Sequence, residues 1–135
     1  MSNKSPIFCK NVMTQDFEKV DGVMTVDEAL KIMKSKNINQ IIVNKRDQHD
    51  EYGLVQLSDI AKHVIAKDRA PERVNLYEIM AKPVLCVRAE MDIRYCARLF
   101  HQFGLQAAPV VDSDKIVGVV SYRDIVLNWL EYLEE

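Results

Sequence analysis

The chain has 135 residues, of which 48% are hydrophobic and 28% are charged, so it can bury a core without disulfides or metal. Its formal net charge of −2 excludes a general electrostatic attraction to nucleic acid or to an anionic membrane. No apolar run reaches the roughly 20 residues of a membrane-spanning helix. The three cysteines form no C-x-x-C pair and the first ten residues hold no apolar signal core, so we expect free thiols and a cytoplasmic location.

The first half of the chain predicts a helix, a hairpin and a second helix. Apolar residues from Val26 to Met33 recur at i, i+3, i+4 and i+7, which is typical of an amphipathic helix, and Thr25 with Glu28 is a plausible capping box. Strands are expected over 40–43 and near 53–55, and a closing helix near Asp59. The acidic turn between the strands, 44–53, is interpreted as a solvated hairpin tip rather than a metal site.

The second half repeats this order after a charged stretch, 66–75, in which Pro71 disfavours a continuous helix. Asp92 is the candidate cap of a helix with the same apolar stripe, from Ile93 to Phe100. Strands follow over 108–111 and 117–120, and a closing helix starts near Asp124. Each half therefore reads β-α-β-β-α.

The two halves are related by a shift of 67 residues, which becomes 65 after the longer turn of the first half. Val20 then falls on Val87 and Val43 on Val110. We predict an α/β (α+β) fold in which the sheets of tandem β-α-β-β-α motifs pack together into one core. The predicted module spans residues 1–135, with motifs at 8–66 and 76–133 and a linker at 67–75.

The end of each half carries a recognisable pattern, G-h-h-[ST]-x-x-D-[IL], in which h is apolar. Residues 118–125 match it fully, and residues 53–60 match it except at Gln56. The run 108–112, APVVD, and the openings Val12-Met13-Thr14 and Ile79-Met80-Ala81 extend the pattern. From about residue 8 to 133, the chain resembles the CBS-domain family, whose paired motifs are called Bateman modules.

This resemblance implies a regulatory module without chemistry of its own. Its two motifs would pack about a pseudo-twofold axis and leave two clefts that take AMP, ADP, ATP or S-adenosylmethionine. No cofactor is required. The resemblance also implies a homodimer, and the absence of an effector domain implies a separate effector protein, with neither nucleic acid nor membrane as partner.

The resemblance implies two candidate sites, each of which combines residues of both motifs. An ionised carboxylate accepts hydrogen bonds, so Asp124 is expected to bind ribose hydroxyls, with Ser121 and Arg123 toward a phosphate. The first site, which the full motif favours, comprises Ser121, Tyr122, Arg123 and Asp124 with Thr14, Glu18, Ile38, Gln40 and Ile41. The second possible site comprises Asp59, Gln56, Leu85, Ala107 and Pro109.

Plainer interpretations stand beside these. Ser121-x-x-Asp124 also fits an ordinary helix cap, and both roles can coexist. The apolar C-terminal run from Ile125 to Leu133 fits either packing on the domain's own core or a dimer contact. Gln56 and Glu18 favour a different function, a dimeric interaction scaffold with no nucleotide ligand. No nucleophile-base or metal-ligand constellation is visible, so we do not predict an enzyme.

Overall fold

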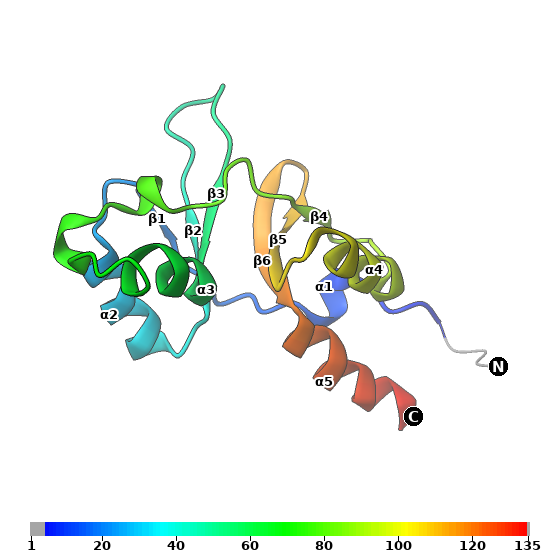
Figure 1. Ribbon diagram of the computed structural model, residues 1–135. Helices are drawn as coiled ribbons and strands as arrows, with labels where there is room; N and C mark the ends of the chain where they lie inside the picture. Colours follow the sequence, from blue (N-terminus) through cyan, green and yellow to red (C-terminus); the bar gives the residue numbers. More distant parts are fainter. Residues whose placement is uncertain (1–4, 135) are drawn as a thin grey trace. The chain divides into compact units, whose positions relative to one another are not determined.

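The computed structural model describes residues 5–134, and the chain folds as two compact units (Figure 1). Residues 17–84 form one of them, called here the first-repeat unit. Residues 5–16 together with 85–134 belong to the other, called the second-repeat unit. Residues 1–4 and 135 of the predicted module lie outside the described residues.

The first-repeat unit is a three-stranded sheet with helices. Strand β1 pairs in parallel with β2, which pairs antiparallel with β3 from Gln40 opposite Gln56 to Val43 opposite Gly53. Its elements are β1 (Lys19–Val20), α2 (Val26–Lys36), β2 (Gln40–Val43), β3 (Gly53–Gln56), α3 (Leu57–Ile60), the π-helical η1 (Ala61–Ile65), and the short 3-10 helices η2 (Pro71–Arg73) and η3 (Leu76–Glu78).

The second-repeat unit has the same order of elements. Its sheet is β4-β5-β6, again with one parallel and one antiparallel pair. Its elements are α1 (Cys9–Val12), β4 (Val87–Arg88), α4 (Ile93–Phe103), β5 (Ala107–Asp112), β6 (Lys115–Ser121) and α5 (Tyr122–Leu133). The predicted α/β (α+β) class with tandem β-α-β-β-α motifs is confirmed.

Local capping sets where helices α2 and α4 begin and end. Thr25 Oγ1 accepts a hydrogen bond of 3.2 Å from the amide of Glu28 and starts α2, and Asp92 accepts one of 2.9 Å from the amide of Arg94 and starts α4. The Arg94 guanidinium holds the pKa of Asp92 below its usual range. Asn37 and Gly104 end these helices in the left-handed conformation. Both predicted N-caps are confirmed.

Each unit is completed by a segment that precedes or follows its own repeat. Val26 donates its amide to Val74 O at 2.8 Å in the first-repeat unit, and Ile93 donates to Ile7 O at 2.9 Å in the second-repeat unit. These hydrogen bonds are equivalent under the 67-residue shift. The bonds from Leu76 to Met24 O and from Cys9 to Met91 O, at 2.9 and 2.8 Å, form a second equivalent pair.

The buried residues show the same division. In the first-repeat unit, Val74, Leu76 and Ile79 are 2%, 0% and 5% exposed and belong to one hydrophobic cluster with the sheet and α2. In the second-repeat unit, Cys9 and Val12 occupy the corresponding place. The compact units therefore differ from the sequence repeat, which placed Val74 in a linker and Leu76 in the second motif.

The segment that each unit receives from outside its repeat, 67–84 or 5–16, is called here the inserted segment. In each unit, a methionine of this segment lies close to a glycine of the sheet. A Cβ on Gly118 would lie 2.6 Å from Met13 Sδ and 2.9 Å from Thr14 O, and a Cβ on Gly53 would lie 2.6 Å from Met80 Sδ. Glycine therefore permits the approach because it has no side chain. Only at Gly118 is one of the obstructing atoms part of the backbone.

Gly118→Ala is expected to lower the free energy of unfolding by about 1–3 kcal/mol, because the backbone of Thr14 must move to admit the methyl group. Gly53→Ala should cost less, since its closest contact is with the flexible Met80 side chain. Urea denaturation of both variants measures the difference. Equal losses would contradict the role given to the Thr14 backbone.

A fragment of residues 17–84 should fold by itself, whereas a fragment of residues 8–66 should not. The second fragment lacks Val74, Leu76 and Ile79, and burial of each such side chain contributes about 1.5–3 kcal/mol. Circular dichroism and thermal unfolding of both fragments test this expectation. A cooperative transition in fragment 8–66 would show that the inserted segment is dispensable.

Candidate functional site

The junction between β6 and α5 holds the residues that the sequence favoured. Ser121 is the N-cap of α5, and its Oγ accepts a hydrogen bond of 3.2 Å from the amide of Asp124. Asp124 Oδ2 in turn accepts hydrogen bonds of 2.9 Å from Ser121 N and from Ser121 Oγ. The capping interpretation is therefore confirmed, and the side chain of Asp124 is only half-buried.

Thr14 reaches this junction through the inserted segment. Its amide donates to Val119 O at 2.8 Å and its carbonyl accepts from Val119 N at 2.9 Å. This pairing places Thr14 Oγ1 within 2.9 Å of Asp124 Oδ1, to which it donates a hydrogen bond. The structure thus brings together two predicted site residues that are 110 positions apart.

The Asp124 carboxylate is largely engaged by these contacts. A carboxylate has about four acceptor positions, and Thr14 and Ser121 supply three donors. A ligand with two hydroxyl groups would therefore exchange with at least one of these donors. The hydroxyls of Thr14 and Ser121 are the donors that can rotate away, because the Ser121 amide is fixed by the backbone.

The equivalent junction in the first-repeat unit is more open. Asp59 Oδ2 accepts a hydrogen bond of 2.8 Å from Gln56 N, where α3 begins. Ala81 pairs with Leu54 as Thr14 pairs with Val119, but it has no hydroxyl to donate. Within residues 5–134, no other hydrogen bond to the Asp59 carboxylate is found. Asp59 therefore keeps more free acceptor positions than Asp124.

Two further predicted residues of the first site lie in the second-repeat unit. The ring of Tyr122 packs edge-to-face on Phe100, with the ring centroids 5.3 Å apart, so it serves the core. Arg123 is exposed at the start of α5, and no ion pair to a carboxylate of residues 5–134 holds its side chain.

Four predicted residues of the first site belong to the first-repeat unit. Glu18 forms a 2.7 Å ion pair with Lys36, and Ile41 is fully buried in the hydrophobic cluster of that unit. Gln40 is half-buried at the start of β2, and Ile38 is half-buried two residues before it. The contribution of these four residues to a site with Asp124 stays a prediction.

The predicted residues of the second site are likewise divided. Asp59 and Gln56 lie in the first-repeat unit. Leu85, Ala107 and Pro109 lie in the second-repeat unit, where Ala107 is opposite Ser121 and Pro109 is opposite Val119. A joint site of these five residues also stays a prediction.

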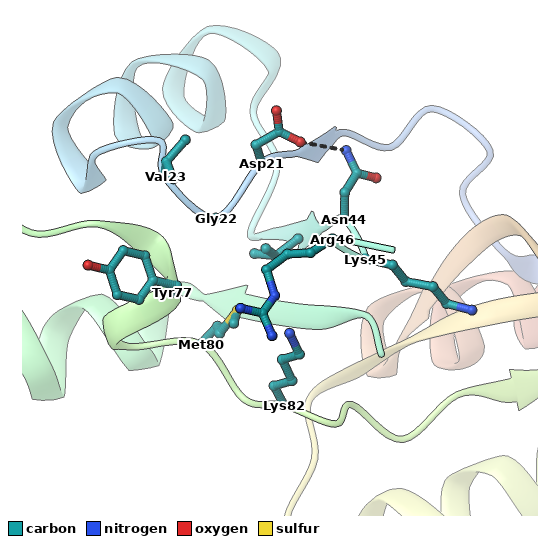
Figure 2. A pocket seen from close by; sticks show the side chains of 10 residues that line it. Asp21, Gly22, Val23, Asn44, Lys45, Arg46, Tyr77, Met80 and Lys82 are labelled. Atoms are coloured by element: carbon teal, nitrogen blue, oxygen red, sulfur yellow. Dashed lines mark hydrogen bonds between the residues drawn. The ribbon is translucent and has the colours of Figure 1, made fainter. Parts of the chain in front are cut away.

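A pocket that the sequence did not predict lies at the other end of the first-repeat hairpin (Figure 2). Its volume is about 660 Å³. The lining combines three basic side chains with polar and apolar ones, and consists of Asp21, Gly22, Val23, Val43, Asn44, Lys45, Arg46, Tyr77, Met80 and Lys82. We name it the basic pocket.

One carboxylate organises the charges of the basic pocket. Asp50 Oδ1 lies 2.7 Å from Lys82 Nζ, and Asp50 Oδ2 accepts hydrogen bonds from Arg46 N and Arg46 Nε at 2.8 and 3.2 Å. The Lys82 ammonium, followed by the Arg46 amide, holds the pKa of Asp50 well below its usual range. The turn predicted to be a solvated tip thus includes a carboxylate whose side chain is only 10% exposed. Lys82 is 32 residues from Asp50, so no local pattern signals the pair.

The fold and the duplicated strand-to-helix junction define a tandem CBS-type architecture. The family model of the CBS domain matches twice, at residues 9–66 and 76–131. The chain belongs to the CBS-domain family.

The curated relatives that match this chain include longer proteins. The uncharacterized protein MK0525 of Methanopyrus kandleri is 28% identical over 75% of this chain and 51% of its own length. Homoserine O-acetyltransferase of Methanohalobium evestigatum is 30% identical over 90% of this chain and 24% of its own length. The chain thus spans about half or less of these curated relatives.

Among solved structures, the hexameric CBS-CP12 protein from bloom-forming cyanobacteria has a TM-score of 0.88 and 36% identity, covering 93% of this chain and 73% of that chain. The CBS domain pair of protein MJ0100, in complex with 5′-methylthioadenosine and S-adenosyl-L-methionine, has a TM-score of 0.80 and 23% identity, covering 95% of this chain and 99% of that chain. The second likeness concerns the fold.

The described residues include neither a membrane-spanning helix nor a cluster of metal-ligating side chains. Within residues 5–134, no helix is long and apolar enough to cross a membrane. In the same range, no three histidine, cysteine, aspartate or glutamate side chains gather as a metal would require.

Ser121→Ala is expected to lower the free energy of unfolding by about 1 kcal/mol, because α5 loses its N-cap hydroxyl. Thermal or urea denaturation measures the loss. Ser35→Ala, at an exposed serine inside α2, serves as the matched control and should be neutral or slightly stabilising, since alanine is the better helix former. A neutral Ser121→Ala would mean that the hydroxyl does not stabilise the helix.

Proposed function

We propose that the chain is a regulatory module that binds an adenosine-type ligand, such as AMP, ADP, ATP or S-adenosylmethionine, and catalyses no reaction. The observation that carries the proposal is the repeated junction at which a strand ends, a helix begins, and a half-buried aspartate lies at the third helical position. Asp124 and Asp59 occupy this position in the two units. A solved CBS pair of the same fold holds two adenosine compounds, so the fold can accommodate that ligand class.

The chemistry of the junction fits a ribose phosphate. The carboxylate of Asp124 can accept hydrogen bonds from the ribose hydroxyls, in exchange with Thr14 Oγ1. The N-terminus of α5, a helix of 12 residues, favours a negative charge through the helix dipole, and the exposed Arg123 adds a cation. The amides of Tyr122 and Asp124 already donate to Gln106 O and Ser121 Oγ. Hydrogen bonds to charged groups contribute about 1.5–3 kcal/mol each.

The proposal includes the cleft that the sequence resemblance implied. In the proposed arrangement, the two sheets would face each other about a pseudo-twofold axis, and the aspartate of one motif would act with base contacts of the other. Asp124 would act with Glu18, Ile38, Gln40 and Ile41. Asp59 would act with Leu85, Ala107 and Pro109. Binding would then shift the motifs or the protomers, and a separate effector protein in the cytoplasm would respond to that shift.

An exposed apolar face favours a second candidate function, a homodimeric interaction scaffold. Along α5, five apolar side chains are about half exposed to solvent. Exposed apolar patches of this kind are typical of surfaces that contact another protein. They are Val126, Leu127, Trp129, Leu130 and Leu133, with exposed fractions of 46–52%. Dimerisation and ligand binding are compatible, so the scaffold is an alternative only if no nucleotide binds.

A thermal-shift screen with AMP, ADP, ATP and S-adenosylmethionine tests the proposal. A ligand at a hundred times its dissociation constant stabilises the folded state by about 2.7 kcal/mol, which raises the melting temperature by several degrees. We expect at least one of these ligands to give such a shift. If none does at millimolar concentration, the scaffold becomes the better account.

Asp124→Ala and Asp59→Ala then assign the site by calorimetric titration of the ligand found. The lost hydrogen bonds should weaken binding about tenfold or more in the variant that carries the ribose contact. Calorimetry is needed because Asp124→Ala also removes a cap and lowers stability by itself. Unchanged affinity in both variants would contradict a site at either junction.

A further inference from the structure

We propose that the basic pocket of the first-repeat unit is a binding site for a small phosphate monoester with a flat or apolar body. This site is additional to the adenosine site proposed above and does not depend on it. All residues that line it belong to the first-repeat unit.

The Lys82 ammonium is held in place before any ligand arrives. The Asp50 side chain, 10% exposed, contacts Lys82, whose side chain is 22% exposed, and also Arg46, whose side chain is 83% exposed. A cation fixed on a nearly buried carboxylate loses less entropy on binding an anion than a freely moving surface lysine does. The pocket therefore has one preorganised cation, Lys82, beside the more exposed Arg46.

Two cations face the pocket, and a third lies at its margin. Lys45 Nζ lies 4.9 Å from the centroid of the Tyr52 ring and extends away from the pocket, so Arg46 and Lys82 are the cations available to an anion, with Asp50 beside both of them. Arg46 uses its main-chain amide and Nε on Asp50, and within residues 5–134 neither of its Nη nitrogens has a hydrogen-bond partner. A guanidinium with two free Nη groups is suited to bind a phosphate through paired hydrogen bonds.

The remaining lining suits the body of a larger molecule. The Tyr77 side chain is 55% exposed and can contact a flat ring. Figure 2 shows the guanidinium of Arg46 pointing toward Met80 and Lys82. The Lys45 side chain extends away from them. The 660 Å³ volume falls within the range of about 300–1,000 Å³ that is typical of small-molecule sites. An inorganic phosphate ion alone would leave most of this space and the apolar wall unused.

The side chains that line the basic pocket differ from their counterparts in the other repeat. Under the 67-residue shift, Tyr77 corresponds to Lys10, Lys82 to Gln15, and Lys45 to Asp112. The second-repeat unit has the same backbone hydrogen bonds but not this set of side chains. The basic pocket therefore reflects residues particular to one copy.

The basic pocket is also separate from the Asp59 junction within the same unit. The pocket includes Val43, which is opposite Gly53, whereas Gln56 at the junction is opposite Gln40. These two ends of the hairpin are three residues apart, or about 10 Å along a strand. A ligand in the basic pocket can bind without using Asp59.

Titration of the isotope-labelled full chain with phenyl phosphate, followed by amide chemical shifts, tests the proposal. We expect saturable shifts at Gly22, Asn44 and Lys82 and weaker binding of inorganic phosphate, which lacks the ring. Arg46→Gln should weaken phenyl phosphate about tenfold or more. Tyr77→Ala, at a half-exposed ring, should weaken phenyl phosphate but not inorganic phosphate.

Two further variants make the result decisive. Lys31→Gln removes the same charge from an exposed position on α2 and should leave binding unchanged. Asp59→Ala should also leave it unchanged, which separates this site from the proposed adenosine site. The proposal is overturned if no saturable shift occurs at millimolar phenyl phosphate, if Lys31→Gln weakens binding as much as Arg46→Gln does, or if Asp59→Ala abolishes binding.

Discussion

The pairing of a segment from outside the repeat with the last strand of each sheet is the constraint on which both candidate sites depend. An unpaired edge strand exposes amide and carbonyl groups, and the pairs Val119–Thr14 and Leu54–Ala81 satisfy part of the edge in β6 and β3. The same segments place Met13 and Met80 over glycines that have no side chain. The junction and the basic pocket both receive residues from these segments.

One backbone design thus carries two different sets of side chains. Thr14 donates a hydrogen bond to Asp124 in the second-repeat unit, and Ala81 leaves Asp59 more open in the first-repeat unit. One position further along, Lys82 binds Asp50, whereas its counterpart in the repeat is Gln15. Small changes in an inserted segment therefore alter the charge and the free acceptor positions of each unit while the hydrogen-bonded framework is kept.

The polar groups at the junctions and in the basic pocket are suited to binding a ligand. The charged groups found at the two junctions and the basic pocket accept, donate or attract, and none of them is a nucleophile held beside a base in the described part of the chain. The exposed apolar residues of α5 lie on the same helix that begins at the Asp124 junction.

Local patterns in the sequence were enough to predict most elements and part of the first candidate site. The capping residues Thr25 and Asp92 act on amides two or three positions away, so their role is visible in a short window. The alternation of strands, turn and helix in each repeat is local in the same sense. The spacing Ser121-x-x-Asp124 likewise indicated a helix cap, and the two side chains are hydrogen-bonded in the structure.

By itself, the sequence determined the repeat, its element order, its helix caps and its family, because these depend on neighbours along the chain. Only the tertiary structure decided that Val74 and Leu76 belong to the core of the first-repeat unit, that Thr14 donates to Asp124, and that Asp50 joins Lys82 to Arg46. Asp50 and Lys82 lie 32 positions apart in the sequence, and Thr14 and Asp124 lie 110 positions apart. Pairing of the inserted segments creates them, and its partners are chosen by packing and by edge hydrogen bonds rather than by any local pattern.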